Sequence, residues 1–275
     1  MHFLALLLVC LLMMWCTPLR RGLPVDIPQL WAGFAARRLA DRPLLSVVLL
    51  LLPLLPVALL QVWLVAQGWA FMTLLLFVVV LLACMGRGDP LGSMMDSFEA
   101  ALARGDVEAA ALVAEHEQGV VGQDAAGVLT AMRAALVRDM LHGYVVTVFW
   151  FVLLGPVGAL GYRLLRLRLA QDVPAGGPVS ALAHALEWVP ARLMAASFAL
   201  VGHFDHARQV LEDALLSWDV AADDLVARTA EAALTGGEGS LADEGDNAAL
   251  ADTRALLKRA LLAWAVVLAL LAVLG

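Results

Sequence analysis

Two long apolar runs, separated by only two residues, constrain the fold of this chain more than any other feature. Residues 44–66 and 69–85 contain no charged side chain and almost no polar one. A helix of about 20 apolar residues crosses the hydrocarbon core of a bilayer. The two runs therefore predict a helical hairpin in the membrane, with a tight turn at Gln67-Gly68 and a kink at Pro53 and Pro56.

Further apolar runs predict additional membrane spans. Residues 144–162 form a strong third candidate, and residues 260–274 form a short fourth one. Residues 3–15 are short, so this segment either spans with the help of its flanks or lies in the membrane interface. No segment alternates apolar and polar residues as a half-buried strand does. We therefore expect an all-α, polytopic helical membrane protein with four spans, five if residues 3–15 also cross, and small helical-hairpin soluble parts.

Composition supports this class and excludes several others. The chain is 62% hydrophobic and only 16% charged, whereas soluble domains are about 45–50% apolar and about 25% charged. The net charge of −7 argues against a nucleic acid partner, which requires a basic surface. The three cysteines, Cys10, Cys16 and Cys84, lie in or beside apolar runs and predict no disulfide framework. No basic residue precedes the first apolar run, so we expect that segment to be retained rather than cleaved as a signal peptide.

Arginines that flank the hairpin predict its orientation. Arg37, Arg38 and Arg42 precede it and Arg87 follows it, while its tip carries no charge. Because positively charged flanks stay in the cytoplasm, the tip should face away from the cytoplasm, and residues 87–143 should be cytoplasmic.

The third span conflicts with this rule. If residues 144–162 cross completely, three arginines follow on the outer side. Either residues 155–161 (GPVGALG) break the helix so that the chain returns, or residues 188–201 dip back into the membrane. Both alternatives are open from the sequence.

These patterns divide the chain into six parts. We expect an N-terminal apolar segment and amphipathic helix at 1–43, a transmembrane hairpin at 44–86, an acidic helical cytoplasmic loop at 87–143, a membrane region at 144–203, an acidic helical region with a flexible linker at 204–258, and a C-terminal span at 259–275. Within the polar parts, Gly105 and Gly202 predict helix ends, and Asp106 and Asp205 predict the caps of the helices that follow.

Few side chains have the types and spacing that catalysis requires. There is no Walker-type phosphate loop, and the only lysine is Lys258. His203, Asp205 and His206 are weak metal candidates, because zinc requires three or four ligands and no cysteine or further histidine is near in sequence. We predict no catalytic residue and no cofactor, and leave binding of magnesium or a nucleotide open.

Two places combine ionisable groups with apolar surroundings. His142 stands where a polar helix enters the third span, as either a titrating group or a cap of that span. Arg192 follows Pro190, a residue that suits the start of a helix. A buried Arg192 requires an anionic partner, and Glu187 or a bound phosphate would serve, in a functional or a structural role.

The same region carries a recognisable pattern. Residues 148–165 read VFWFVLLGPVGALGYRLL, and residues 186–203 read LEWVPARLMAASFALVGH. The chain resembles, over its whole length, the AmpE family of bacterial inner-membrane proteins, and more distantly the cobalamin-biosynthesis membrane enzymes CobD and CbiB. The residues that match the shared pattern are Phe149, Trp150, Gly155, Gly158, Tyr162, Trp188, Pro190 and Arg192.

The resemblance implies a multi-pass protein of the bacterial inner membrane. It implies regulatory signalling linked to β-lactamase induction and peptidoglycan recycling, with binding of a ligand or partner rather than catalysis. The alternative is a membrane-bound transferase or ligase of the adenosylcobinamide-phosphate synthase type, which uses ATP and magnesium. The acidic and amide residues of those enzymes are not matched at residues 133–143 and 164–168, which disfavours this alternative.

We expect an anionic small ligand and a cytoplasmic or periplasmic protein partner in cell-wall recycling, in addition to the lipid bilayer. The residues that we single out as binding candidates are His142, Tyr144, Trp150, Tyr162, Arg163, Glu187, Trp188 and Arg192.

Overall fold

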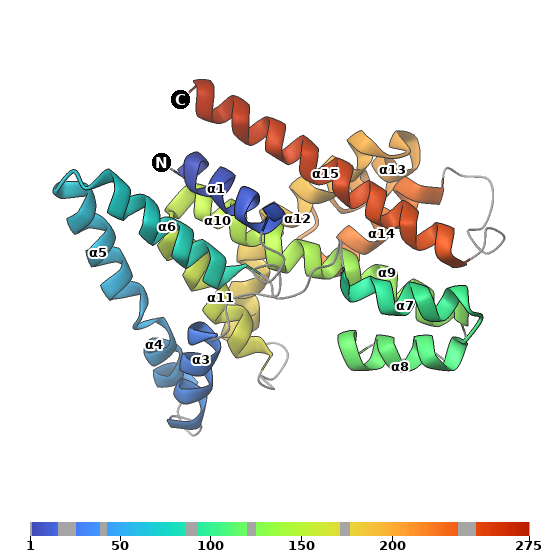
Figure 1. Cartoon of the computed structure of the whole chain (residues 1–275), viewed down its shortest axis with the longest axis horizontal. Helices are drawn as coiled ribbons and strands as arrows, with labels where there is room; N and C mark the ends of the chain where they lie inside the picture. The colour runs from blue at the N-terminus through green and yellow to red at the C-terminus, as the bar shows by residue number, and fades with distance from the viewer. Residues whose placement is uncertain are drawn as a thin grey trace. The chain divides into compact units, whose positions relative to one another are not determined.

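All regular structure in the described part of the chain is helical, which confirms the predicted all-α class (Figure 1). The computed structural model describes residues 2–15, 26–38, 43–85, 93–119, 125–170, 177–235 and 246–274. The helices are α1 (His2–Trp15), α3 (Ile27–Arg38), α4 (Pro43–Leu51), α5 (Leu54–Ala66), α6 (Ala70–Cys84), α7 (Ser93–Ala103), α8 (Val107–Gln118), α9 (Ala125–Met140), the π-helical turn η1 (Leu141–Val145), α10 (Val146–Leu154), α11 (Pro156–Leu169), α12 (Pro178–Val201), α13 (Phe204–Ala214), α14 (Ala222–Thr235) and α15 (Asp246–Leu274).

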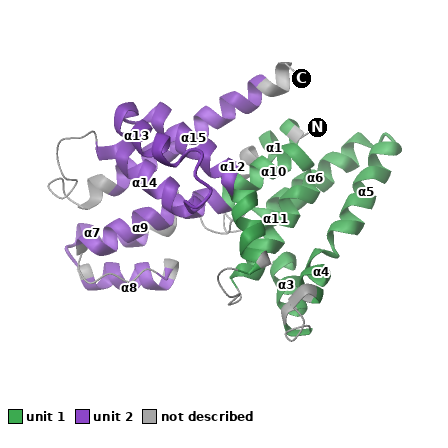
Figure 2. Ribbon diagram, turned by 180° about the vertical axis from the view of Figure 1, so that it is seen from behind, with its two compact units in different colours: residues 1–87, 143–187 green, residues 88–142, 188–275 purple. Residues whose placement is uncertain are grey.

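The helices group into two units, which Figure 2 colours separately. Unit 1 comprises residues 1–87 and 143–187, and unit 2 comprises residues 88–142 and 188–275. Nine arginines and four acidic residues give the sequence of unit 1 a net charge of +5. Nine basic and 21 acidic residues give the sequence of unit 2 a net charge of −12. The net acidity of the chain therefore belongs entirely to unit 2.

Two helices are long and apolar enough to cross a membrane, judged by length and composition. They run over Val47–Ala66 and Ala126–Leu154, and the apolar helix Ala70–Cys84 is shorter. The C-terminal apolar run forms the second part of α15. Long apolar helices of this kind support an association of the chain with membrane.

The predicted apolar hairpin is present as α4, α5 and α6. Its arms turn at Gln67-Gly68, where Gly68 adopts a φ of +71° that glycine tolerates without strain. The expected kink takes the form of an interruption at Leu52-Pro53, because Pro53 lacks the N–H group that would continue the helix.

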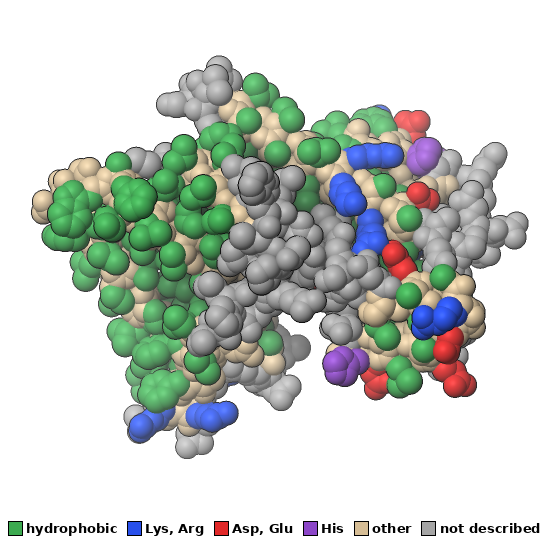
Figure 3. Space-filling model, viewed as in Figure 1, with side chains coloured by type: hydrophobic (Ala, Val, Ile, Leu, Met, Phe, Trp, Pro, Cys, Tyr) green, Lys and Arg blue, Asp and Glu red, His purple; other side chains and the backbone are tan. Residues whose placement is uncertain are grey.

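The hairpin exposes about half of its described large apolar side chains. Leu59 on α5 is 70% exposed, and Phe71 on α6 is 72% exposed. Hydrophobic side chains cover the face of α5 and α6 seen in Figure 3. Because soluble monomers rarely expose contiguous apolar patches beyond a few hundred Å², this surface fits a lipid environment.

The predicted third span at 144–162 is not one continuous helix. α10 ends at Leu154 and α11 begins at Pro156, with Gly155 between them at a φ of +69° and a ψ of −156°. α11 then packs back against α10. A Cβ on Gly158 would lie 2.5 Å from the carbonyl oxygen of Trp150, so the close approach of the two helices requires glycine there. Of the two alternatives that the sequence leaves open, the break of the helix is therefore present.

The predicted helix end and cap between α7 and α8 are confirmed. α7 ends at Ala103, and Gly105 adopts a φ of +70°. The carboxylate of Asp106 accepts a hydrogen bond from the backbone N–H of Ala109 at 3.0 Å, which satisfies an otherwise free donor at the start of α8.

The predicted cap of α13 is wrong by two residues. His203 occupies the N-cap position, and Asp205 lies in the first turn. The backbone N–H of His203 donates to the carbonyl oxygen of Ala233 at 2.9 Å, which fixes the chain before the helix begins. A Cβ on Gly202 would lie 2.7 Å from the same oxygen, so this turn packs closely on the end of α14.

Candidate functional site

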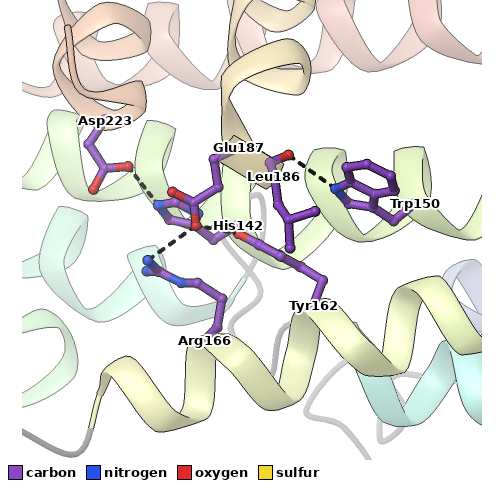
Figure 4. A network of polar contacts seen from close by, with 7 residues as sticks. All are labelled: His142, Trp150, Tyr162, Arg166, Leu186, Glu187 and Asp223. Carbon is purple, nitrogen blue, oxygen red and sulfur yellow. Dashed lines mark hydrogen bonds and ion pairs between the residues drawn. The ribbon is translucent and has the colours of Figure 1, made fainter. Parts of the chain in front are cut away.

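A buried carboxylate forms the centre of the candidate site in unit 1 (Figure 4). Glu187 is 7% exposed, and its Oε1 accepts a hydrogen bond from the hydroxyl of Tyr162 at 3.0 Å. Arg166 donates to the same oxygen from Nη1 at 3.4 Å and supplies a counter-charge. Burying a charge is costly unless it is paired and hydrogen-bonded, and these two partners meet both conditions.

Two helices position this network. Tyr162 and Arg166 are four residues apart on α11, so their side chains lie on one face of the helix. Glu187 comes from the first part of α12. The buried side chains Leu165, Val179 and Ala183 form the cluster that packs α11 against α12.

Pro190 lies inside α12 and not, as expected, at the start of a helix, since α12 runs from Pro178 to Val201. Proline has no N–H group, so the carbonyl group of Leu186, four residues earlier, loses its helical donor. The indole Nε1 of Trp150 donates to that carbonyl oxygen at 3.1 Å. The first turn of a helix, with its free N–H groups, is therefore not available beside Arg192 for an anion.

The same arrangement occurs a second time in unit 1. Pro53 cannot donate to the carbonyl of Leu49, four residues earlier; that oxygen accepts hydrogen bonds from the backbone N–H of Leu52 at 3.3 Å and from the indole Nε1 of Trp31 at 3.2 Å. In both cases a tryptophan from another helix donates to the carbonyl oxygen four residues before a proline.

Arg192 is the most buried cation of unit 2 among its described residues, at 5% exposure. It donates from Nε to the carbonyl oxygen of Leu215 at 2.9 Å and from Nη1 to that of Trp188 at 3.1 Å. Its Nη2 donates to the carbonyl oxygens of Ala214 and Ser217. Three of these four acceptors lie at or just beyond the end of α13, where carbonyl groups have no helical partner and a cation is favoured. Arg192 therefore caps α13, and backbone carbonyls take the place of the anionic partner that the sequence suggested.

Two tryptophans complete the surroundings of Arg192. Its guanidinium carbon lies 4.0 Å from the ring centroid of Trp188, a distance typical of a cation–π contact. Trp188 in turn stacks on Trp218, with centroids 6.0 Å apart and an interplanar angle of 28°. The Nε1 atom of Trp188 is buried and has no hydrogen-bond partner among the described residues.

His142 lies in the π-helical turn η1, at the point where α9 continues into α10. Its Nε2 lies 2.6 Å from Oδ1 of Asp223 on α14, and the His142 side chain is 10% exposed (Figure 4). Single π-helical turns inside α-helices occur frequently at functional sites. Tyr144 belongs to the same turn and is half-buried.

Arg163 forms a second ion pair in unit 1. Its Nη2 lies 3.2 Å from Oδ2 of Asp26, whose side chain is only 7% exposed. Asp26 also accepts a hydrogen bond from the backbone N–H of Gln29 at 2.9 Å, at the start of α3. The pair joins the beginning of α3 to the middle of α11.

The structure thus brings together some of the sequence-predicted residues and separates their roles. Tyr162 and Glu187 share one network, and Trp188 and Arg192 share another. Trp150 donates a hydrogen bond to the carbonyl oxygen of Leu186 on α12. The partners Asp26, Arg166, Trp218 and Asp223 were missed. Long-range pairing carries no signature in a single sequence, although Arg166 lies one helical turn from Tyr162 and could have been found by that spacing.

The described residues contain no group of three or more histidine, cysteine, aspartate or glutamate side chains that could hold a metal ion. His203, Asp205 and His206 are all exposed, at the start of α13. Unit 1 thus holds a buried anion, and unit 2 holds a buried cation with aromatic faces, and side chains of these kinds are suited to recognition.

Comparisons with known proteins agree with the resemblance seen in the sequence. The model of the family described as "Regulatory signalling modulator protein AmpE" matches residues 3–275. Protein AmpE of Shigella flexneri is 30% identical over 149 residues, which is 49% of this chain and 52% of that protein. The chain thus matches about half the length of this relative. No solved structure matches the chain. The match of the family model over residues 3–275 shows that the chain belongs to the AmpE family of regulatory signalling modulators.

Proposed function

We propose that this protein is a multi-pass protein of the bacterial inner membrane that modulates β-lactamase induction and peptidoglycan recycling by binding a ligand or a partner. In this proposal unit 1 and the apolar second part of α15 are the membrane parts, and the rest of unit 2 is cytoplasmic. Family membership supports the regulatory role. The buried residues support binding more than catalysis, because they hold one another in fixed positions.

The exposed apolar surface of α5 and α6 is the observation that carries the membrane assignment. The apolar segment Val47–Ala66 has 20 residues. Only 11% of its most apolar 18-residue stretch is buried inside the structure. A helix of this length rises about 30 Å, the thickness of the hydrocarbon core. The break at Gly155 supports the cytoplasmic side for Arg163, Arg166 and Arg168, because a chain that returns there keeps these arginines on the side that the positive-inside rule prefers.

Recognition would involve the two buried networks and the π-helical turn. The residues we propose for it are His142, Tyr144, Trp150, Tyr162, Arg163, Glu187, Trp188 and Arg192. An anionic small ligand would be attracted by the arginines, and a protein partner in cell-wall recycling by the exposed helices of unit 2.

Membrane insertion and topology can be tested together. The full chain, with Cys10, Cys16 and Cys84 replaced by alanine, receives a single cysteine at Gln67, Glu108 or Glu212. The protein should stay in the membrane fraction after alkaline carbonate extraction. An impermeant thiol reagent should label Gln67→Cys in intact cells, and should label Glu108→Cys and Glu212→Cys only after permeabilisation. Extraction by carbonate would overturn the membrane assignment, and labelling of either unit 2 position in intact cells would overturn the topology.

The regulatory role requires a separate measurement. We expect deletion of the chain to change β-lactamase activity after exposure to an inducing β-lactam, and the wild-type chain to restore the original response. Restoration should fail with Glu187→Gln inserted at wild-type level, because that variant removes the buried charge. Full restoration by Glu187→Gln would argue against the proposed binding network, and an unchanged response after deletion would argue against the regulatory role.

A further inference from the structure

One end of unit 1 gathers five arginines. Arg37 and Arg38 form the last turn of α3, and Arg163, Arg166 and Arg168 lie in the second half of α11. α3 and α11 pack against one another, as Figure 1 shows. The five arginines face only two described acidic residues in unit 1, Asp26 and Glu187. Among the described residues of this part, positive charges therefore exceed negative charges by three.

This end lies where the apolar hairpin begins. Arg38 precedes Pro43, the first residue of α4, by five positions. The neighbours of Arg166 and Arg168 on α11, Leu165 and Leu169, belong to the cluster that contacts Val47 near the start of α4. Both groups of arginines are thus placed at the same end of the hairpin.

The opposite end of the hairpin has a different chemistry. Its tip contains no charge and carries Trp63 and Trp69, whose rings are 5.5 Å apart. Tryptophan is enriched at membrane–water interfaces. The helix between the tip and the arginines is about as long as the hydrocarbon core is thick. If the tryptophans of the tip lie at one membrane–water interface, the arginines at the other end of the hairpin lie at the level of the lipid headgroups of the opposite leaflet.

Two of the five arginines are neutralised by ion pairs with described residues, and three are not. Arg163 is paired with Asp26, and Arg166 with Glu187. Arg37, Arg38 and Arg168 form no ion pair with any described residue. The Nε of Arg168 is buried and lacks a hydrogen-bond partner among the described residues. Arg38 lies over the ring of Phe34, 5.4 Å from its centroid, which orients its guanidinium group.

We infer that Arg37, Arg38 and Arg168 form a binding site for the phosphate groups of anionic phospholipids in one leaflet. This inference rests on the proposed membrane placement of unit 1. Guanidinium groups bind phosphate oxygens through paired, charge-assisted hydrogen bonds. The occupant is a lipid rather than a free anion, because the surface beside these arginines is apolar and suits acyl chains. Unit 2, with its net charge of −12, is repelled by the same headgroups.

Native mass spectrometry of the delipidated full chain in neutral detergent tests the inference. Phosphatidylglycerol and phosphatidylcholine with the same acyl chains are the probes, and bound lipid is measured for each. The test variant is Arg37→Gln/Arg38→Gln/Arg168→Gln. The matched control is Arg104→Gln/Arg208→Gln/Arg228→Gln, which removes three exposed arginines of unit 2. Each basic residue near an anionic membrane surface raises the affinity for that surface by about fivefold.

We expect the wild type and the control to prefer phosphatidylglycerol at least tenfold, and the test variant to bind both lipids within about twofold. An Arg→Lys version of the test variant should keep most of the preference, because it keeps the charge. No preference in the wild type, or an equal loss in the control, would overturn the inference.

Displacement of the lipid by 50 mM inorganic phosphate would indicate a free-anion site and would also overturn it. If the test variant does not fold, Arg168→Gln alone should lower the preference several-fold. Carbonate extraction of the wild type would instead reject the membrane placement, so the two failures are distinguishable.

Discussion

The indole Nε1 of Trp150 lies 3.1 Å from the carbonyl oxygen of Leu186, the helical acceptor whose usual donor is absent because residue 190 is proline. A buried acceptor without a donor costs about 1–3 kcal/mol. Trp150 therefore allows α12 to continue through Pro190 without that cost. The relationship links the Phe-Trp pair on α10 to the Trp-Val-Pro sequence on α12 through one hydrogen bond.

Replacing Trp150 with phenylalanine should destabilise the protein by about 1–3 kcal/mol, since the indole donor is lost. In a Pro190→Ala background, the backbone N–H of residue 190 can donate to Leu186, and the same substitution should cost less than half as much. Thermal unfolding of the four proteins in detergent measures the coupling as a double-mutant cycle. Equal costs in both backgrounds would show that the indole contributes only through packing.

Gly158→Ala should be strongly destabilising, because its Cβ would lie 2.5 Å from the carbonyl oxygen of Trp150 and 2.7 Å from the Cβ of Leu154. We expect a loss of about 2 kcal/mol or more, since α10 and α11 must separate. Gly33→Ala is the control, because nothing lies within 4 Å of its added Cβ. In a helix interior the control should gain about 0.5–1 kcal/mol. Thermal unfolding measures both changes, and a stable Gly158→Ala protein would contradict the close packing of the two helices.

Arg192→Ala should loosen the end of α13. The substitution leaves the carbonyls of Leu215, Ala214 and Ser217 without their shared donor, and we expect a loss of at least about 3 kcal/mol. Amide hydrogen exchange of residues 214–221 should accelerate. The control Arg208→Ala removes only an exposed pair with Glu212 and should cost less than about 0.5 kcal/mol. Unchanged exchange in Arg192→Ala would mean that the cap contributes little to the order of this segment.

Tyr162→Phe and Glu187→Gln test the buried network. Tyr162→Phe removes one hydrogen bond to the carboxylate and should cost about 1–3 kcal/mol. Arg166 still compensates the charge of Glu187 in that variant. Glu187→Gln should leave a smaller effect for Tyr162→Phe in the double variant, because a hydrogen bond to a neutral amide is weaker than one to a carboxylate. Thermal unfolding provides the cycle, and strict additivity would show that the two side chains do not interact.

The elements whose signals are local could be predicted from the sequence. The apolar hairpin, its turn at Gln67-Gly68 and the cap at Asp106 each depend on residues within a few positions of one another. The helix break at Gly155 was one of two open alternatives, and a positive-charge rule alone could not select it. Local signals failed at Pro190, where a helix start was expected. A proline inside a helix is tolerated there because of Trp150, and that contact spans 36 residues.

The candidate site was predicted as a set of residues rather than as a geometry. The sequence suggested an anionic partner for Arg192 if this residue were buried; it is buried, and most of its partners are backbone carbonyls from a turn more than 20 residues away. Carbonyl acceptors leave no trace in the identity of side chains, so an anionic partner was the natural expectation. Glu187 was considered as the partner of Arg192, but it pairs with Arg166 on α11 instead.

The two units are interleaved along the chain, which bears on the order in which they can form during synthesis. Unit 1 is complete once residue 187 has left the ribosome. In unit 2, by contrast, α7 packs against α15, and α9 packs against α14 and α15, and these partners are synthesised later. The first half of unit 2 therefore exists for a time without the helices against which it packs. Chains that end before α15 should carry a finished unit 1 and an unfinished unit 2, and would be expected to be removed by proteases at the unfinished part.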